Sequence, residues 1–260
     1  MITIRSAAMA AIATTLFAGP LLGQEQFRWN GRVAQGGAIE IKGMNGGINA
    51  VAATGDEVRV QATKRGRRSD PADVRIEVLQ HSGGVTICAV YPTPGGEPAN
   101  ECRPGSAGRS GVRNNDVQVE WNVEVPRGVN FIGRTVNGGI DGRGLPAGAE
   151  GRTVNGGVRL AAAGVVRASS VNGAVDVTMG RSDWTDRLEL ETVNGALTVR
   201  FTGALDADVS ARTVNGAIET DYPLEVRGRF NSRNLTGVVG SGGRELALKT
   251  VNGAIRLVRQ

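Results

Sequence analysis

One short string recurs along this chain and constrains its fold more than any other feature. Val-Asn-Gly, followed by Gly or Ala and then an aliphatic residue, occurs six times, and a degenerate copy at Met44-Asn45-Gly46-Gly47-Ile48 precedes the six. The asparagines of the seven copies are Asn45, Asn137, Asn155, Asn172, Asn194, Asn215 and Asn252. Recurrence at such intervals is typical of proteins whose units stack on one another and bury a shared core.

The intervals between copies indicate where the units begin and end. Counted from Asn to Asn, the six full copies lie 18, 17, 22, 21 and 37 residues apart. The last interval is about twice as long as the others, and Leu235-Thr236-Gly237-Val238-Val239 divides it into 21 and 16 residues. We therefore interpret this segment as a further degenerate copy.

The residues on either side of each motif predict two strands joined at a corner. Leu188, Leu190 and Thr192 fall on even positions, whereas Val193, Gly195 and Leu197 fall on odd ones. Successive side chains of a strand alternate between its faces, so a slip of one residue joins two strands that both face one interior. The pattern predicts that the motif valine and the first glycine point inward and that the asparagine points outward.

Two all-β architectures are compatible with this pattern. Asn-Gly between apolar runs is a strong hairpin signal, so a meander with a turn at every Asn-Gly is one possibility. The other is a β-solenoid of stacked two-strand rungs, in which the motif keeps its length while loops of variable length point outward. The solenoid also accounts for the recurring Thr and Val, and we expect it. Asparagines stacked on neighbouring rungs would then exchange amide hydrogen bonds as a ladder.

The first half of the chain is patterned differently and suggests a boundary near Pro126. Alternating apolar residues around Val58–Ala62, Val74–Val78, Val85–Ile87 and Val117–Val125 predict antiparallel strands. We expect these strands to cap the open end of the solenoid. The predicted organisation is a signal peptide over 1–23, a strand-rich segment with a Pro/Gly-rich loop over 24–126, and the repeats over 127–260.

Several features predict export. Arg5 precedes an uncharged stretch, residues 7–22, that is rich in Ala and Leu and short for a membrane span, and cleavage is expected near Gly23. No later stretch is long and apolar enough to cross a bilayer, so the mature chain should be periplasmic, on the outer surface or secreted. Cys88 and Cys102 are expected to form a disulfide, which for this loop length stabilises by about 3 kcal/mol.

The signal peptide, the strand-rich front and the serial Val-Asn-Gly-x-Ile motifs over about residues 35 to 260 resemble a bacterial family of unknown function, the putative adhesins with β-strand repeats. The resemblance implies a β-solenoid at or near the cell surface. It brings no catalytic or binding residues, and it does not cover the Cys88 to Cys102 loop.

The sequence offers little of the chemistry that catalysis requires, which is a titrating or nucleophilic group held beside a base or a metal. His81 is the only histidine and lies beside a Ser-Gly-Gly turn. Acidic residues follow some motifs, but basic or neutral residues follow the others in alternation: Asp141, Arg159, Asp176, Thr198, Glu219 and Arg256. The calcium-binding Gly-Gly-x-Gly-x-Asp nonapeptide is missing. We predict no catalytic residues, no metal and no cofactor.

The residue before each corner is mostly basic. This column reads Arg134, Arg152, Ser169, Glu191, Arg212, Arg233 and Lys249. On stacked rungs it could bind phosphate or carboxylate groups of an anionic glycan, or it could keep a β surface soluble and block edge association. Nucleic acid is not an expected partner despite a pI of about 9.8, because aromatics are only 4% of residues.

The function that these observations favour is an adhesin-like structural protein of the cell envelope. It would present a rigid β surface to a glycan or to an envelope protein. Two alternatives stay open at this point, an enzyme of β-helix architecture that acts on polysaccharide and a periplasmic partner in envelope-stress signalling.

Overall fold

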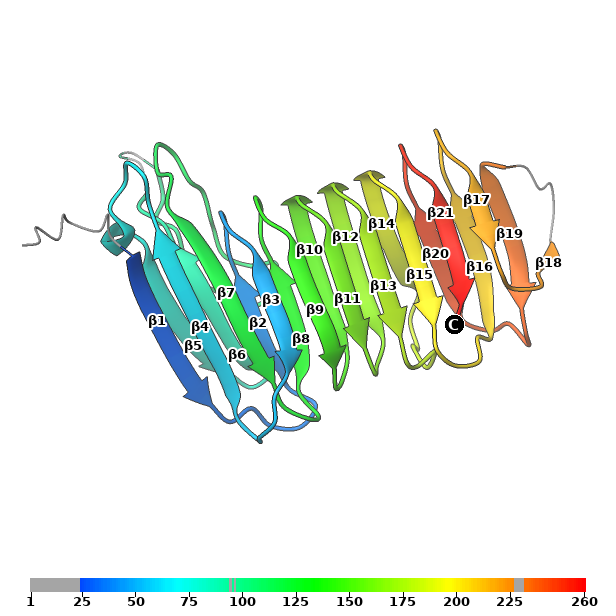
Figure 1. The fold of residues 1–260 in the computed structure, drawn as a ribbon, viewed down its shortest axis with the longest axis horizontal. Coiled ribbons are helices and arrows are strands. Elements are labelled where there is room, and N and C mark those ends of the chain that lie inside the picture. Colours follow the sequence, from blue (N-terminus) through cyan, green and yellow to red (C-terminus); the bar gives the residue numbers. More distant parts are fainter. Residues whose placement is uncertain (1–23, 94, 96, 227–231) are drawn as a thin grey trace, which may run out of the picture.

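The fold is all-β and consists of two large mixed sheets that face each other across one apolar core (Figure 1). The computed structural model describes residues 24–93, 95, 97–226 and 232–260 of the 260-residue chain. The predicted signal peptide, residues 1–23, lies outside the described residues. Within the described part, helix is limited to one short 3-10 turn, Pro71–Asp73.

Strand order shows how the two sheets are assembled. The first sheet runs β1(Gln24–Gly31), β4(Val58–Arg65), β7(Gln118–Val125), β3(Ile48–Ala52), β9(Ile140–Leu145), β11(Val158–Ala162), β13(Val175–Met179), β15(Leu197–Phe201), β21(Ile255–Arg259) and β17(Ile218–Thr220). The second runs β18(Glu225–Val226), β19(Asn234–Val239), β16(Ala207–Arg212), β20(Glu245–Lys249), β14(Leu188–Asn194), β12(Val166–Asn172), β10(Ala149–Asn155), β8(Asn130–Arg134), β2(Ala38–Lys42), β6(Gly84–Val90) and β5(Arg75–His81).

Each of the seven copies connects a strand of the second sheet to a strand of the first. The chain passes, for example, from β10 through Gly156 and Gly157 into β11. Because the strands that flank each Asn-Gly lie in different sheets, they do not pair with each other as a hairpin. They pair in parallel with the equivalent strands of neighbouring copies instead, and Asn155 is the register partner of Asn172.

The copies do not stack in the order of the sequence. The last copy inserts between two earlier ones, because β20 pairs with β14 and β16 while β21 pairs with β15 and β17. The interpretation of residues 235–239 as a repeat copy is wrong. That segment forms β19, which runs antiparallel to β16. A turn over Gly240–Gly243 then crosses the end of β16, where Asp206 and Asp208 accept hydrogen bonds from its backbone N–H groups.

The strand-rich front of the chain forms one end of both sheets. Antiparallel pairs β4–β7 and β5–β6 lie there, as the alternating pattern predicted. β1, which the pattern did not predict, pairs antiparallel with β4. The degenerate copy around Asn45 connects β2 and β3, which pair in parallel with β8 and β9. This copy therefore stacks directly on the copy around Asn137, although more than 90 residues of sequence separate the two.

The core is aliphatic, as the low aromatic content indicates. Inward-facing Val, Ile and Leu of both sheets form one continuous cluster of buried residues, with Trp121, Phe131 and Phe201 among the largest. The inward prediction for the motif valine is wrong. Five of these valines have exposed fractions of 39–55%. The inward pattern stops at the threonine before the motif and resumes at the aliphatic residue after it, so the corner spans four residues.

Candidate functional site

The surface that recurs most regularly is the outer edge where the motifs stack, which we call the corner face. It consists of the Val, Asn, Gly and Gly/Ala residues of the seven copies, with Met44 in place of Val in the degenerate copy. Its outward columns are the exposed valines and the asparagines. Strands of parallel sheets repeat every ~4.8 Å, so the corner face presents the same side chains at that interval.

Buried hydroxyl groups hold the corner in shape. The residue before each motif valine is a Thr or Ser with an exposed fraction of 3–6%. Its hydroxyl donates to the carbonyl of the first motif glycine on the neighbouring rung; Thr192 Oγ1 lies 2.7 Å from Gly173 O, and Thr153 Oγ1 lies 2.8 Å from Gly138 O. Equivalent bonds link Thr135 to Gly46, Ser170 to Gly156, Thr213 to Gly253 and Thr250 to Gly195.

The first motif glycine is required by close approach of the next rung. A Cβ on Gly173 would lie 2.1 Å from Gly156 O, and one on Gly138 would lie 2.0 Å from Gly46 O. These carbonyls are the ones that accept hydrogen bonds from the buried hydroxyls, Gly156 O from Ser170 and Gly46 O from Thr135. The sequence pattern predicted that this glycine points inward, but a Cβ at this position would meet the backbone of the neighbouring copy along the stack.

The seven asparagines form one ladder. Six hydrogen bonds of 2.7–2.9 Å link them, and in each the Nδ2 of one asparagine donates to the Oδ1 of the next, in the order Asn215, Asn252, Asn194, Asn172, Asn155, Asn137 and Asn45. At the end of the ladder, Asn45 Nδ2 donates to Val117 O at 3.5 Å. All donors point the same way, and chains of aligned hydrogen bonds polarise one another. An amide has two N–H groups and an oxygen with two lone pairs, so each asparagine inside the ladder, from Asn137 to Asn252, keeps one donor and one acceptor site for a ligand or water.

A ridge of valines runs beside the ladder. Val154, Val171, Val193 and Val251 are each 39–40% exposed, and Val214 is 55% exposed. Scattered surface valines are ordinary, but a contiguous exposed apolar row indicates an interaction surface. The sequence did not reveal this ridge, because the odd-position pattern placed the same valines inside.

A groove of about 430 Å³ follows the other side of the ladder on the first sheet. Its floor is formed by the fourth residue of each motif, such as Gly157, Ala174 and Ala196. These side chains are too small to fill the groove. The acidic and basic residues that alternate after successive motifs line this groove, and Asp141, Arg159 and Asp176 are register partners there. Asp141 pairs with Arg143 and Arg159, and Asp176 pairs with Arg200. Both aspartates at these positions are therefore ion-paired with arginine.

The predicted basic stripe is only partly assembled, and most of it is ion-paired. Lys42, Arg134, Arg152, Ser169, Glu191, Lys249, Arg212 and Asn234 are successive register partners on the second sheet. The position beside Arg212 that was assigned to Arg233 is thus held by Asn234, because β19 runs antiparallel. Lys249 pairs with Glu189, and Arg152 Nε lies 2.8 Å from Glu150 Oε1.

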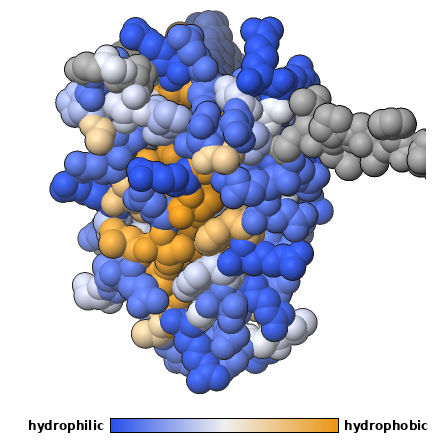
Figure 2. Space-filling model, turned by 90° about the vertical axis from the view of Figure 1, so that its left-hand side faces the viewer, coloured by the Kyte–Doolittle hydropathy of each residue, from blue (hydrophilic) through white to orange (hydrophobic). Residues whose placement is uncertain are grey.

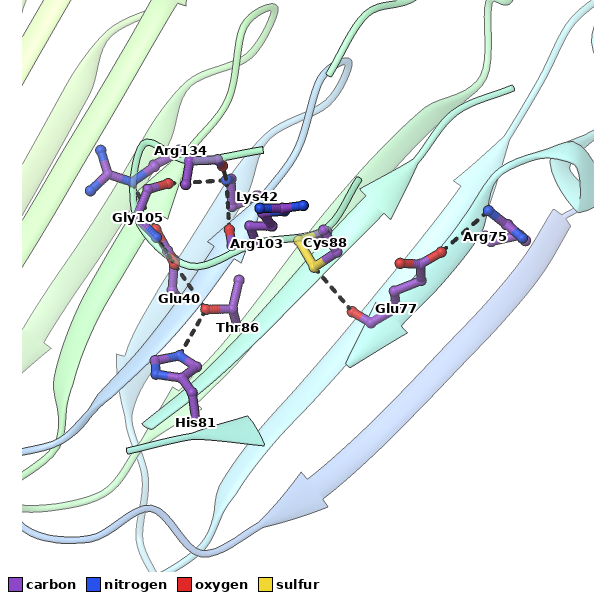
Figure 3. Close-up of a disulfide and its surroundings, with 12 residues drawn as sticks. Glu40, Lys42, Arg75, Glu77, His81, Thr86, Cys88, Arg103, Gly105 and Arg134 are labelled. Carbon is purple, nitrogen blue, oxygen red and sulfur yellow. Dashed lines mark hydrogen bonds and ion pairs between the residues drawn. A yellow bond between two sulfur atoms is a disulfide. The ribbon is translucent and has the colours of Figure 1, made fainter. Parts of the chain in front are cut away.

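Arg134 belongs to a buried network that the sequence did not predict. It contacts Glu40 at 2.8 Å and Glu150 at 2.9 Å, and Glu40 is 4% exposed. Glu40 also accepts hydrogen bonds from Thr86 Oγ1 and from Gly105 N, both at 2.9 Å (Figure 3). Removing a partner from such a network leaves a buried charge unpaired. Arg134 therefore has a structural role on the second sheet.

His81 extends this network. Its Nδ1 accepts a hydrogen bond from Gly83 N at 3.2 Å, so the proton lies on Nε2, which donates to Thr86 Oγ1 at 3.1 Å (Figure 3). The only histidine is thus engaged in structural hydrogen bonds and is not simply an exposed turn residue.

A disulfide anchors residues 97–117, the disulfide loop, over the second sheet. Cys88 on β6 and Cys102 in the loop are bonded, with their Cα atoms 5.6 Å apart, as the sequence predicted. Lys42 Nζ reaches into the loop and donates to the carbonyls of Arg103, Gly105 and Ala107 at 2.8–3.0 Å (Figure 3). Burial lowers the pKa of Lys42, partly offset by Glu40. The adjoining cavity of about 290 Å³ is lined by Lys42, Arg134 and Arg152. Lys42 donates to the loop carbonyls, and the two arginines are paired with Glu40 and Glu150.

The described residues contain no group of three His, Cys, Asp or Glu side chains that could hold a metal ion. No helix in the described part of the chain has the length and apolar character needed to cross a bilayer.

Comparison with known proteins finds only distant likeness. No family model and no curated protein matches the chain. A putative cell adhesion protein from Clostridium sporogenes ATCC 15579 is 13% identical with a TM-score of 0.48, over 92% of this chain and 100% of that one. A putative adhesin from Bacteroides fragilis NCTC 9343 is 11% identical with a TM-score of 0.41, over 92% of this chain and 99% of that one. Similarity at this level assigns neither family nor function.

Proposed function

We propose that this chain is an exported, adhesin-like structural protein whose repeats form a β-solenoid and whose corner face binds an extended glycan without chemical turnover. The observation that carries the proposal is the coincidence of two unbroken columns, the asparagine ladder and the exposed valine ridge. A structural requirement accounts for the buried Thr and the close-packed Gly of each copy. It does not account for exposed valines, which contribute little to the core.

The chemistry of the two columns matches carbohydrate. The free N–H and lone pair of each amide can serve a hydroxyl group, and the neighbouring valine offers apolar area to a sugar ring. An extended polysaccharide presents similar groups at regular intervals, so the ~4.8 Å repeat of the rungs allows many weak contacts to add. The disulfide supports an oxidising compartment such as the periplasm or the cell exterior.

A neutral or weakly charged glycan fits better than a strongly anionic one. Arg134, Arg152 and Lys249 of the basic stripe are committed to Glu40, Glu150 and Glu189. An anionic glycan that binds the stripe would have to break these ion pairs. Its affinity would also fall with ionic strength, because salt screens interactions between exposed charges. Binding through the corner face should change little between low and high ionic strength.

The test is sedimentation of purified protein with insoluble cell-wall glycan, together with binding to an array of envelope glycans at low and high salt. Val171→Glu with Val193→Glu introduces charge in the centre of the ridge and should weaken binding at least about tenfold, equivalent to about 1.4 kcal/mol. The matched control is Val51→Glu with Leu79→Glu, two exposed apolar residues away from the corner face, at 46% and 37% exposure.

Unchanged affinity of the ridge variant, with wild-type thermal stability, would refute the corner face as the binding surface. Affinity that falls steeply with salt, and that is lost in Arg212→Gln, would assign binding to the basic stripe. Absence of binding to every glycan would refute carbohydrate as the ligand class.

A further inference from the structure

Among the residues that the structure describes, β1 and β5 are the last strands of their sheets at one end of the molecule. Within this part of the chain β1 pairs only with β4, and β5 pairs only with β6, so each strand leaves one row of backbone N–H and C=O groups without a strand partner. An edge of this kind favours pairing with another chain unless it is blocked. Both sheets end at the same place, so two such edges lie opposite each other (Figure 1).

Apolar side chains fill the space between the two edges. Phe27 and Trp29 of β1 are register partners of the core residues Ala62 and Val60, and so face the interior. Ile76 and Val78 of β5 are the partners of Ala89 and Ile87 on the opposite side. All four remain partly exposed, and Val78 has an exposed fraction of 37%. Figure 2 looks at this end and shows an apolar strip between hydrophilic flanks.

Polar contacts limit the strip without covering it. Lys64, which is 4% exposed, binds Glu25 and the carbonyl of Val74, both at 2.8 Å, and this closes one end of the space between the sheets. On the outer face of β5, Arg75 and Glu77 alternate in charge and contact each other at 3.3 Å. A patch of apolar residues with a polar rim is the usual composition of a protein interface.

We propose that this end binds the same end of a second copy around a two-fold axis. An occupant that satisfies both edges must offer two strands in two layers with the ~10 Å spacing of packed sheets. The β1/β5 end of another copy has that geometry by construction, whereas one extended peptide would pair with one edge and leave the strip exposed. A two-fold axis perpendicular to the sheets pairs β1 with β1 and β5 with β5, both antiparallel.

Charge on β5 supports this occupant. Antiparallel pairing centred on Ile76 sets Arg75 of each copy opposite Glu77 of the other, and it places the two Ile76 side chains together inside. The same operation extends both sheets and puts the two corner faces on opposite edges of the dimer. The proposal rests on the end strands alone and is independent of what the corner face binds.

The test is the molar mass of the protein purified from cells expressing the full sequence, measured by light scattering and sedimentation up to about 100 μM. The wild type should be a dimer, and Val78→Lys should weaken the dimer at least about tenfold because it places a charge in the strip. Leu79→Lys is the matched control, since Leu79 is equally exposed at 37% but lies on the outer face of the same strand. It should remain dimeric.

A charge exchange tests the pairing even if Val78→Lys fails to fold. Arg75→Glu should weaken the dimer by opposing acids across the axis, and Arg75→Glu with Glu77→Arg should restore it. A wild type that is monomeric at every concentration would overturn the proposal. A dimer that resists both Val78→Lys and Arg75→Glu would also overturn it, because the contact would then lie elsewhere.

Discussion

At the scale of single residues, each motif position has a separate physical role. The hydroxyl before the motif and the first glycine hold neighbouring rungs together, while the valine and the asparagine face outward. The recurrence of these residues was evident from the sequence, and so was the outward asparagine. The outward valine was not, because a corner of four residues has no single period from which side-chain direction can be read.

Adjacent glycines of one copy should differ sharply in their tolerance of a methyl group. Gly138→Ala brings a Cβ within 2.0 Å of Gly46 O, so the free energy of unfolding should fall by clearly more than about 1 kcal/mol. Gly139→Ala, with its nearest atom at 3.4 Å and with alanine already present at the equivalent Ala174, should change it by less than about 1 kcal/mol. Urea denaturation of the two variants measures both changes in the free energy of unfolding. Equal losses would show that the rungs are not packed this closely.

At the scale of elements, the disulfide loop is the part that departs from the repeats. The cysteine pair was predictable from composition and spacing, but the contacts of Lys42 and Tyr91 with the loop were not, because they depend on strands far apart in sequence. Tyr91 is 3% exposed, and its hydroxyl donates to Val117 O at 2.8 Å. Burial raises the pKa of Tyr91 to about 12.

This pKa predicts a loss of stability in alkali. The pKa of Tyr91 in the folded protein is above the ordinary value of 10. The protonated hydroxyl therefore contributes fully to the free energy of unfolding below pH 10, and this contribution is lost as the pH rises to about 12. The loss should reach about 3 kcal/mol. The chain has two tyrosines, so Tyr222→Phe isolates Tyr91 for titration by tyrosinate absorbance. The midpoint should lie near 12 in the native protein and near 10 in urea. A native midpoint near 10 would contradict the burial of this hydroxyl.

At the scale of the whole molecule, the chain stacks its copies out of sequence order, with the copy at Asn252 between those at Asn194 and Asn215 on the corner face. The repeat and its two strands could be read from the sequence, but the insertion of the last copy between the copies at Asn194 and Asn215 could not. Interval lengths report how much chain separates two copies and not which copy lies between them. The reversal at Gly240–Gly243 and the antiparallel β19 make the insertion possible.

Cross-linking of rungs tests this stacking most directly. Glu191 and Lys249 are register partners on the exposed side of the second sheet, whereas Arg212 lies one strand further, beyond Lys249. A disulfide requires Cα atoms within about 7 Å, which only neighbouring strands satisfy. Glu191→Cys with Lys249→Cys should therefore form a disulfide, detected by mass spectrometry of unreduced peptides, and Glu191→Cys with Arg212→Cys should not. A disulfide in the 191/212 variant, together with free thiols in the 191/249 variant, would contradict the stacking order β14-β20-β16 described here.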